Sequence, residues 1–554
     1  MSTQNHSLVT LQEPIRVLII DDKPGDQQAA KEVFESCGLR MTFTFASLYD
    51  DALEKLCYQY VDIAVVDLVL HPGPPGPQED WEGFDLLQEL LERGLHQDLV
   101  VIVFTAFGRE PEVTREAFVT FHVADVWDKS YSKGRLLDSL QRALEQEDYF
   151  GLRSSVVFDG DLSWKSLISS LRLPLYQLSS AVEPGEAEGE IRHLLRRLFP
   201  KADRLGVAPM NSGGSGAGVI RVTPSYRDGG RAADVIVKYG PIDSLRREYA
   251  GWKRVNCFLS GFRSTQILKT VWGRHLGAME YSLVGANLRE VVPFSKYYIG
   301  ASGDEIRSTL DKLFLETCGL WYQSMTTTGS PVNLADAYGQ YLGFSRQNIE
   351  PAFRFKYPEW PVNQADIRFA MLPRKMLHPI AEFCQGKAVF SWETAVCLNH
   401  GDFHGENIRV DPPSKEAWLI DFGRADCAHW ARDFVQLETV IKFQLTQHAE
   451  LPALFEFEDI LSSADDLSQD LQLFRDDLPD LQKAFQSVIW IRRLAAKAAG
   501  RLEPGLALKD YFAALFYQTI NYVRLHRLIK GGQRKNHVLM SAALVLEKLN
   551  SMPE

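Results

Sequence analysis

The chain has 554 residues, which is too long for a single hydrophobic core and predicts two or three domains. Its 45% hydrophobic and 24% charged residues are typical of a water-soluble globular protein. A formal net charge of -12 argues against a surface that wraps nucleic acid. The seven cysteines are scattered without a close CxxC pair, which favours reduced thiols over a zinc site or a disulfide framework.

Two further absences in the sequence limit the function. The first residues lack the apolar stretch of a signal peptide, and no run of about 18 apolar residues occurs anywhere. We therefore expect a cytoplasmic protein without membrane contacts. No basic helix-turn-helix pattern is found, so a DNA-binding output and a nucleic-acid partner are not expected.

Residues 14–148 alternate short apolar runs with amphipathic helical stretches. The apolar runs IRVLII, IAVV, VIVFTA and VADVW are rich in β-branched residues and bounded by polar ones. Continuous apolar strands separated by helices predict a flavodoxin-like, doubly wound parallel sheet. The functional residues of such a sheet lie at the carboxyl ends of its strands.

Five polar residues follow these strands directly. Asp21 and Asp22 follow the first strand, and Asp67 follows the next buried one. Thr105 ends the strand VIVF, and Lys129 follows VADVWD. Because clustered carboxylates repel each other unless a cation joins them, the pattern predicts a Mg²⁺ site.

This arrangement resembles the receiver domain of two-component response regulators. The resemblance implies that Asp67 is the phosphoacceptor and that a sensor histidine kinase is the partner. It implies Mg²⁺ ligation by Asp21, Asp22 and Asp67, with the Val69 carbonyl as a further ligand. It also implies a phosphate-pairing role for Lys129 and a switch role for Thr105, whose hydroxyl would bond the phosphoryl group.

The sequence departs from this family at three places. The segment HPGPPGPQEDWEG after Asp67 is longer than the usual connection, and Ser130 stands where the family normally has proline. Val126 stands where an aromatic switch residue is usual, and Trp127 comes one position later. We therefore do not expect the family's threonine-to-aromatic relay in its usual form.

After the receiver segment the pattern of apolar and polar residues changes, which predicts a domain boundary. We expect an N-terminal tail at 1–13, the receiver domain at 14–148, a helical connector at 149–204 and a second domain at 205–554. The second domain begins with a glycine-rich loop and β-like alternation, and beyond residue 430 its periodicity is helical almost to the end.

Two compact motifs in this second domain predict magnesium-nucleotide chemistry. The segment LNHGDFHGENIRV offers Asp402, His404 and Asn407 on one short loop, and LIDFGRAD places Asp421 after a strand. One carboxylate can orient an accepting hydroxyl, while an amide and a second carboxylate hold metal on the phosphates.

These motifs resemble the aminoglycoside phosphotransferase and choline kinase branch of the protein-kinase-like fold. The resemblance implies a bilobal domain with a largely helical C-lobe. Asp402 matches the catalytic base, and Asn407 and Asp421 match the metal ligands. His404 is typical of this small-molecule kinase branch and is expected to support the loop, and Asp433 matches a structural aspartate.

Upstream residues fit the same resemblance and imply that ATP or another nucleoside triphosphate binds with Mg²⁺. Lys238 ends the strand ADVIVK, where a kinase places the lysine that contacts the α- and β-phosphates. Glu248 on the next helix is its expected ion-pair partner. Four glycines of NSGGSGAGVIRV would let backbone amides approach the phosphates: Gly213, Gly214, Gly216 and Gly218.

Two functional hypotheses follow from these resemblances. The favoured one is a response regulator, phosphorylated on Asp67, that controls an ATP- and Mg²⁺-dependent phosphotransferase with an unknown hydroxyl acceptor. The alternative is a phosphoreceiver scaffold whose second domain is a nucleotide-binding pseudokinase, acting as an adaptor in a bacterial signalling or conflict system. Intact motifs alone do not distinguish the two.

Overall fold

The computed structural model describes most of the chain: residues 8–10, 14–38, 40–59, 61–70, 81–92, 99–147, 155–171, 184–210, 216–226, 233–259, 265–273, 275–283, 286–372, 374–446, 449–475, 477–525 and 532–553. These residues form two compact units. Unit 1 comprises residues 1–245 and 267–282, and unit 2 comprises residues 246–266 and 283–554. Among the described helices, none has the length and apolar character that crossing a membrane requires.

Unit 1 begins with an α/β domain built on a five-stranded sheet. The strand order is β3-β2-β4-β5-β6, and every neighbouring pair is parallel. This confirms the predicted flavodoxin-like sheet. Its strands are β2 (Ile15–Ile20), β3 (Met41–Ala46), β4 (Ile63–Val66), β5 (Val100–Thr105) and β6 (Asp125–Asp128). Its helices are α1 (Pro24–Glu35), α2 (Tyr49–Tyr58), α3 (Glu82–Glu92), α4 (Pro111–Val119) and α5 (Lys133–Glu147).

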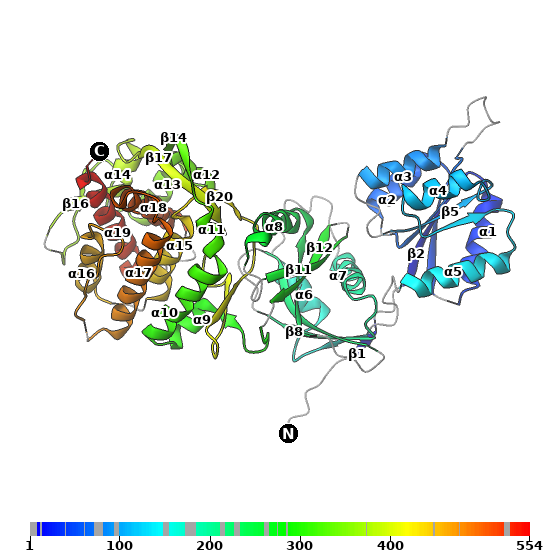
Figure 1. The fold of residues 1–554 in the computed structure, drawn as a ribbon, viewed down its shortest axis with the longest axis horizontal. Coiled ribbons are helices and arrows are strands. Elements are labelled where there is room, and N and C mark those ends of the chain that lie inside the picture. Colours follow the sequence, from blue (N-terminus) through cyan, green and yellow to red (C-terminus); the bar gives the residue numbers. More distant parts are fainter. Residues whose placement is uncertain are drawn as a thin grey trace, which may run out of the picture. The chain divides into compact units, whose positions relative to one another are not determined.

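Helices cover both faces of this sheet, with α1 and α5 on one side and α2, α3 and α4 on the other (Figure 1). Alternate residues of each strand therefore enter two separate cores. Leu18 and Ile20 pack with residues of α2, α3 and α4, while Val17 and Ile19 pack with residues of α1 and α5. Burial on both faces explains why the strands read as continuous apolar runs.

Unit 1 also contains a seven-stranded sheet in the order β1-β7-β8-β9-β10-β12-β11. β7 and β8 run parallel, whereas β1 and β7, β8 and β9, β9 and β10, and β10 and β12 are antiparallel pairs. Residues from α6 (Trp164–Ser170) and α7 (Pro184–Leu198) join its core. The strands are β1 (Leu8–Thr10), β7 (Ser155–Phe158), β8 (Arg204–Pro209), β9 (Gly218–Ser225), β10 (Val235–Pro241), β11 (Thr265–Trp272) and β12 (Leu276–Leu283).

This sheet differs from what the sequence predicts for the tail and the connector. The expected tail at 1–13 contributes β1, and the expected helical connector at 149–204 contributes β7, which lies between β1 and β8. The four residues of β7 are too short a run to stand out from a helical background. Val156 and Phe158 of β7 are buried in a core formed largely by residues that are distant in sequence, and β7 pairs with β8 at residues 204–207.

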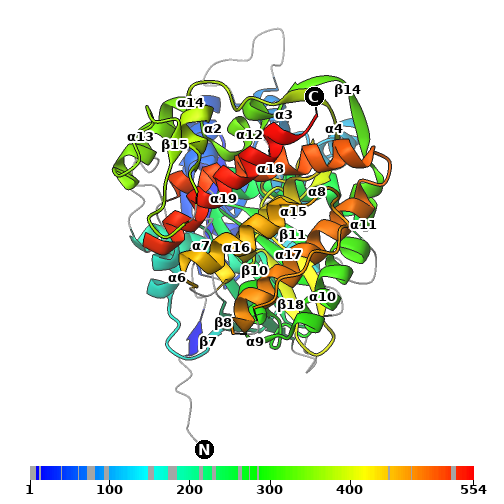
Figure 2. The ribbon, with the colours of Figure 1, turned by 90° about the vertical axis from the view of Figure 1, so that its left-hand side faces the viewer.

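Unit 2 is mainly helical. Helix α18 packs against α15 and α19, and α19 also packs against α16. In Figure 2, helices α16 to α19 lie at the front. The larger helices are α8 (Ile242–Val255, shared with unit 1), α10 (Gly303–Asp311), α12 (Leu334–Leu342), α13 (Arg346–Lys356), α15 (Arg432–Val440), α16 (Leu451–Ser462), α17 (Pro479–Ala498), α18 (Pro504–Arg524) and α19 (Gly532–Ser551).

Shorter elements complete unit 2. Two three-stranded sheets have the orders β13-β18-β19 and β14-β17-β20, and β15 pairs with β16. The strands are β13 (Val292–Pro293), β14 (Thr326–Asn333), β15 (Asp366–Ile367), β16 (Met376–Leu377), β17 (Ser391–Asn399), β18 (Ile408–Asp411), β19 (Glu416–Leu419) and β20 (Asp426–His429). The short helices are η2 (Asn256–Phe258), α9 (Phe294–Gly300), η3 (Lys312–Thr317), α11 (Gly319–Gln323), α14 (Pro379–Cys384) and η4 (Ile441–Leu445).

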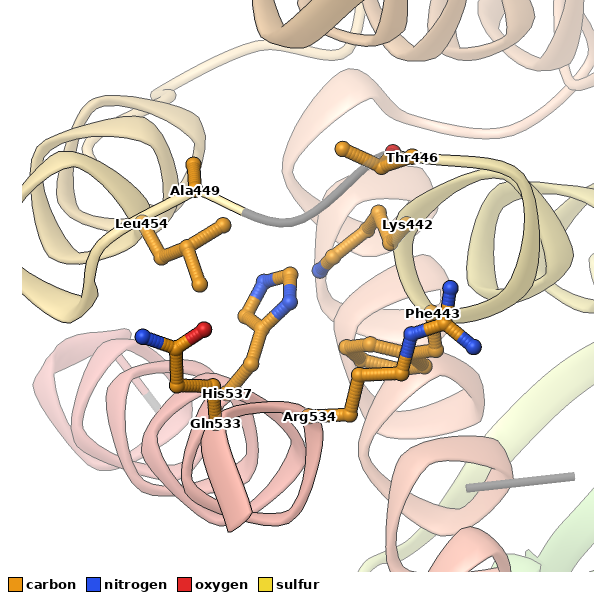
Figure 3. Close-up of a pocket in the computed structure, with 8 residues that line it drawn as sticks. All are labelled: Lys442, Phe443, Thr446, Ala449, Leu454, Gln533, Arg534 and His537. Atoms are coloured by element: carbon orange, nitrogen blue, oxygen red, sulfur yellow. The ribbon is translucent and has the colours of Figure 1, made fainter. Parts of the chain in front are cut away.

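The core of the helical unit contains a buried group of charges. Lys442 Nζ and His537 Nε2 each lie 2.7 Å from an oxygen of Glu458, and all three side chains are at most 4% exposed. Ser541 Oγ donates to Glu458 Oε2 at 2.9 Å. Figure 3 shows Lys442 and His537 pointing toward one another across a pocket. This cavity of about 10 Å³ has room for about one water molecule.

Candidate functional sites

Three carboxylates meet at the carboxyl edge of the five-stranded sheet. Asp21 follows β2 and Asp67 follows β4, and their amides continue the ladders by donating to Ala46 O at 3.0 Å and Ile20 O at 2.9 Å. Each of Asp21, Asp22 and Asp67 offers an oxygen within 4.8 Å of the other two. Because β2 and β4 are parallel neighbours, their ends bring these side chains together as the sequence predicts.

Lys129 reaches this acidic group from the end of β6. Its Nζ lies 2.7 Å from an oxygen of Asp21, of Asp26 and of Asp67. Asp26 comes from the first turn of α1 and is not among the residues predicted for this site. Helical phase on α1 would have placed Asp26 near this edge, but a single aspartate in a first turn is common and carries no specific signal.

The electrostatics of this site favour a bound cation. Burial raises the pKa of Asp21 to about 6 and also raises the pKa of Asp67. Burial acts to lower the pKa of Lys129, but Asp67 and the other two carboxylates raise it above its usual value. Asp22 Oδ1 is buried and accepts no hydrogen bond from any described residue. The ammonium of Lys129 does not balance the negative charge that Asp21, Asp22 and Asp67 carry when all three are ionised. Carboxylate oxygens are ligands that suit Mg²⁺.

The expected switch residues lie close to this site, but the aromatic one does not occupy the usual place. Thr105 is fully buried at the end of β5, and its hydroxyl accepts from Phe107 N at 3.4 Å. Val126 packs in the core beside α3 and α4, whereas Trp127 packs in the opposite core, beside α1 and α5. Trp127 is 1% exposed and donates through Nε1 to Asp125 Oδ2. It therefore does not replace an aromatic residue at position 126.

A set of contacts that the sequence analysis missed joins the loop after β5 to the loop after β6. Arg109 Nη2 donates to Ser130 Oγ at 2.6 Å, and Arg109 Nε lies 3.7 Å from Asp128 Oδ2. Ser130 donates to Asp128 Oδ1 through its amide, at 2.8 Å, and through its hydroxyl. A proline at position 130 has no amide hydrogen and no hydroxyl, so the departure to serine creates this connection.

Two features predicted for this domain belong to the segment that follows Asp67. The segment 71–80, which carries most of the long loop after Asp67, lies outside the described residues. Val69 is described, and its backbone makes a hydrogen bond that favours the ionised form of Asp67. Its role as a metal ligand stays a prediction.

In unit 2, the loop between β17 and β18 brings Asp402 and Asn407 together. Asn407 Nδ2 donates to Asp402 O at 2.9 Å and lies 3.3 Å from Asp402 Oδ2. His404 Nε2 lies 3.6 Å from the same Oδ2. The loop closes on itself because His404 N donates to Asp402 O and Asn407 N donates to His404 O. This geometry is consistent with the expected supporting role of His404.

The charges around this loop are coupled. Burial acts to raise the pKa of Asp402, but the hydrogen bond and charge of His404 hold it below its usual value. Burial acts to lower the pKa of His404, but Asp402 and then Asp421 raise it. Asp421 follows β19 and has a left-handed backbone with φ of 68°. Asp402 is therefore ionised at neutral pH, and Asp421 acts electrostatically on the same histidine.

Asp433 accepts hydrogen bonds from the backbone at the start of this loop. It is fully buried near the start of α15, and its two oxygens accept from His400 N at 2.8 Å and from Gly401 N at 2.9 Å. Burial raises its pKa. The structure thus gives Asp433 the geometry of a residue that supports the loop.

The glycine-rich segment is only partly described. Gly213 and Gly214 lie outside the described residues. Gly216 has φ of 80°, a conformation that favours glycine. Gly218 lies on β9, where an added Cβ would fall 2.2 Å from the ring of Tyr239, so packing also requires glycine there. Whether these glycines bind phosphate stays a prediction.

Lys238 and Glu248 are both buried, at 6% and 2% exposure. Lys238 lies on β10 opposite Met279 of β12, in unit 1. Glu248 lies on α8 in unit 2, where an added Cβ at Gly423 would be 4.0 Å from its Cα. Glu248 is therefore beside the segment that follows Asp421. Because the two residues belong to different units, their expected ion pair stays a prediction.

Comparison with known protein families identifies two segments. Residues 17–141 match the model of the response regulator receiver domain, which confirms the expected receiver domain. Residues 371–521, which include Asp402, Asn407 and Asp421, match the model of ternary complex associated domain 9. That match does not confirm the expected kinase-like domain, which stays a prediction.

Solved structures of receiver domains also match the chain. They include a CheY-like receiver domain protein from Methanospirillum hungatei JF-1, with 19% identity over 24% of this chain and 96% of that chain and a TM-score of 0.20. They also include the chemotaxis protein CheY4 from Vibrio cholerae, with 20% identity over 24% of this chain and 100% of that chain and a TM-score of 0.20. No curated protein matches the chain.

Proposed function

We propose that the chain is a two-component response regulator in which phosphorylation of Asp67 controls a phosphotransferase formed by the region after the receiver domain. The receiver domain implies a histidine kinase as the general kind of partner. The observation that carries this part of the proposal is the position of Lys129 Nζ, 2.7 Å from Asp67 Oδ2, beside the carboxylates of Asp21 and Asp22.

The phosphorylation step uses groups that lie at this edge of the sheet. An Asp67 oxygen attacks the phosphorus of a phosphohistidine, the P–N bond breaks, and the histidine nitrogen takes up a proton. Asp21, Asp22 and Asp67 would hold Mg²⁺, which supplies positive charge to the phosphoryl oxygens. Lys129 would pair with the same oxygens, and Thr105 would turn its hydroxyl toward them.

The second half of the proposal assigns phosphotransfer to the loop that carries Asp402. In this reaction an acceptor hydroxyl attacks the γ-phosphorus of ATP, the bond to the β-phosphate oxygen breaks, and ADP leaves. Asp402 is ionised and would take the hydroxyl proton. Asn407 and Asp421 would hold Mg²⁺, while Lys238 and the glycine-rich loop would contact the phosphates. The contact between Asp402 and Asn407 on a loop supported by Asp433 favours this half.

A scaffold function is the second candidate, because residues 371–521 match a domain model named for association with ternary complexes. In that case the same region would bind a nucleotide without transferring its phosphoryl group, and the receiver domain would regulate assembly. The loop around Asp402 is common to both candidates. Only turnover distinguishes them.

Turnover of ATP by the full chain tests the proposal. We expect Mg²⁺-dependent release of ADP by the wild type and its loss in Asp402→Asn, which keeps the shape of the side chain and removes its charge. Asp411→Asn is the matched control, because this aspartate ends β18 beyond the loop. Equal turnover by Asp402→Asn and the wild type would exclude catalysis by this loop. Mg²⁺-dependent ATP binding without turnover would favour the scaffold.

A further inference from the structure

The peptide groups on both sides of Asp402 are held by side chains. Asp433 fixes the amides of His400 and Gly401, but the Gly401 carbonyl and the Phe403 amide face other residues. Those two groups belong to the peptide units that flank Asp402. Whatever holds them restricts φ and ψ of Asp402, and thereby where its carboxylate lies.

Tyr341 holds the first of these groups. It lies on α12, and its hydroxyl donates to Gly401 O. Arg432 Nη2 lies 3.4 Å from the same oxygen, and the Arg432 guanidinium carbon lies 3.2 Å from the centre of the Tyr341 ring. The stacked guanidinium and ring fix each other, so both donors approach the carbonyl in a defined direction.

Gln436 holds the second group. Its Oε1 accepts from Phe403 N at 2.8 Å and lies 3.2 Å from the Tyr341 hydroxyl. Arg432 and Gln436 are four positions apart on α15, so they lie on the same face of that helix, and both are at most 8% exposed. Tyr341 joins their two contacts into one network.

The conformation of Gly401 makes the network specific. Its φ is 76°, and an added Cβ would fall 2.3 Å from Arg424 O and 2.5 Å from Arg432 Nη2. Only glycine fits this left-handed turn against two neighbours. The turn presents the Gly401 carbonyl to Tyr341 while the Gly401 amide faces Asp433.

We propose that Tyr341, with Arg432 and Gln436, is a positioning residue that sets the orientation of Asp402 for phosphotransfer. This inference rests on the proposed function, because it assigns Tyr341 a role in the reaction of that same loop. A catalytic group displaced by about 1 Å loses up to about 10²-fold in rate. Removal of the Tyr341 hydroxyl takes away the closer of the two donors to the Gly401 carbonyl and leaves the longer contact from Arg432, with the aromatic ring still stacked on the guanidinium.

Tyr341→Phe and Tyr338→Phe in the full chain form a matched pair. Tyr338 lies one turn earlier on α12 and its ring contacts that of Tyr341, but its hydroxyl hydrogen-bonds with His429 Nδ1, at 3.0 Å, instead of with the Gly401 carbonyl. We expect Tyr341→Phe to lower kcat for ATP turnover by about 10- to 100-fold with KM for ATP within about twofold. We expect Tyr338→Phe to change neither. A rise in KM with kcat unchanged in Tyr341→Phe would overturn the positioning role.

Hydrogen exchange gives a readout that needs no turnover. We expect the amides of residues 400–407 to exchange faster in Tyr341→Phe than in the wild type or Tyr338→Phe. Equal protection in all three proteins would overturn the inference, whatever the activity. Turnover that is unaffected by Asp402→Asn would instead overturn the proposed function, and the exchange result would still decide whether Tyr341 holds the loop.

Discussion

Lys129 Nζ lies 2.7 Å from Asp67 Oδ2, although the two residues follow strands that are separated by β5. The lysine side chain therefore crosses the edge of one strand to reach the proposed phosphoacceptor. It contacts Asp21 and Asp26 from the same position. A phosphoryl group on Asp67 would compete with these carboxylates for the ammonium, so phosphorylation would change contacts on β2, α1 and β6 together.

The phosphoacceptor can be tested with a small phosphodonor such as acetyl phosphate. We expect Mg²⁺-dependent labelling of the full chain and no labelling of Asp67→Asn, because the amide cannot form an acyl phosphate. Phosphate-affinity electrophoresis would measure it. Asp85→Asn, an exposed residue in the first turn of α3, should label like the wild type. Equal labelling of Asp67→Asn would exclude this acceptor, and labelling in excess EDTA would contradict the metal site.

The connection from Ser130 to Asp128 predicts a stability change. Ser130→Ala removes the hydroxyl that donates to the 3%-exposed Asp128 carboxylate but keeps the amide donor. We expect a loss of about 1 kcal/mol in the free energy of unfolding, measured by urea titration. Ser132→Ala is the control, because Ser132 is exposed and accepts only a long contact from Arg135 N at 3.4 Å. Equal effects in both variants would contradict the prediction.

The lowered pKa of Glu458 predicts that the stability of unit 2 depends on pH. Burial acts to raise its pKa, but Lys442 and His537 lower it from 4.5 to about 2. Because the folded-state value is the lower one, this carboxylate stabilises the fold above pH 4.5, and its contribution is lost as pH falls toward 2. The full contribution is on the order of 3 kcal/mol. Urea titrations across this range would measure it, and Glu458→Gln should flatten the dependence.

Removing the charge of Lys442 alone should destabilise the fold more than removing the charges of Lys442 and Glu458 together. Lys442→Met leaves Glu458 buried without its ammonium partner, and we expect a loss of about 3–5 kcal/mol in the free energy of unfolding. Lys442→Met combined with Glu458→Gln should be less destabilised than Lys442→Met alone. Thermal unfolding of both variants measures the difference. A double variant that is the less stable of the two would contradict this account.

Gly251 on α8 predicts a strong effect of a single methyl group. An added Cβ would fall 1.9 Å from Phe422 O, a backbone atom next to Asp421. We expect Gly251→Ala to lower the free energy of unfolding by about 1–3 kcal/mol, because helix and loop must separate. Gly505→Ala is the control, because nothing lies within 4 Å of its added Cβ. Alanine lowers the backbone entropy of the unfolded chain, so this variant should be as stable as the wild type or slightly more stable.

The sequence predicted the residues at strand ends because parallel strands place their carboxyl ends at one edge. Asp21, Asp22 and Asp67 are together for that reason alone. The approach of Asn407 to Asp402 was predictable from local spacing within one short loop. Tyr341 was not, because it contacts Gly401 across 60 positions, and no local pattern marks an ordinary helical tyrosine. Arg109 was missed for the same reason, since its partner Ser130 follows a different strand.

The pairing of β1 with β7 has a consequence for how the receiver domain is attached. The chain leaves the seven-stranded sheet after residue 10, forms the receiver domain, and returns to the neighbouring antiparallel strand at residue 155. The segments that lead into and out of the receiver domain are therefore attached to two adjacent, hydrogen-bonded strands of one sheet, so the domain is connected to that sheet at two neighbouring points.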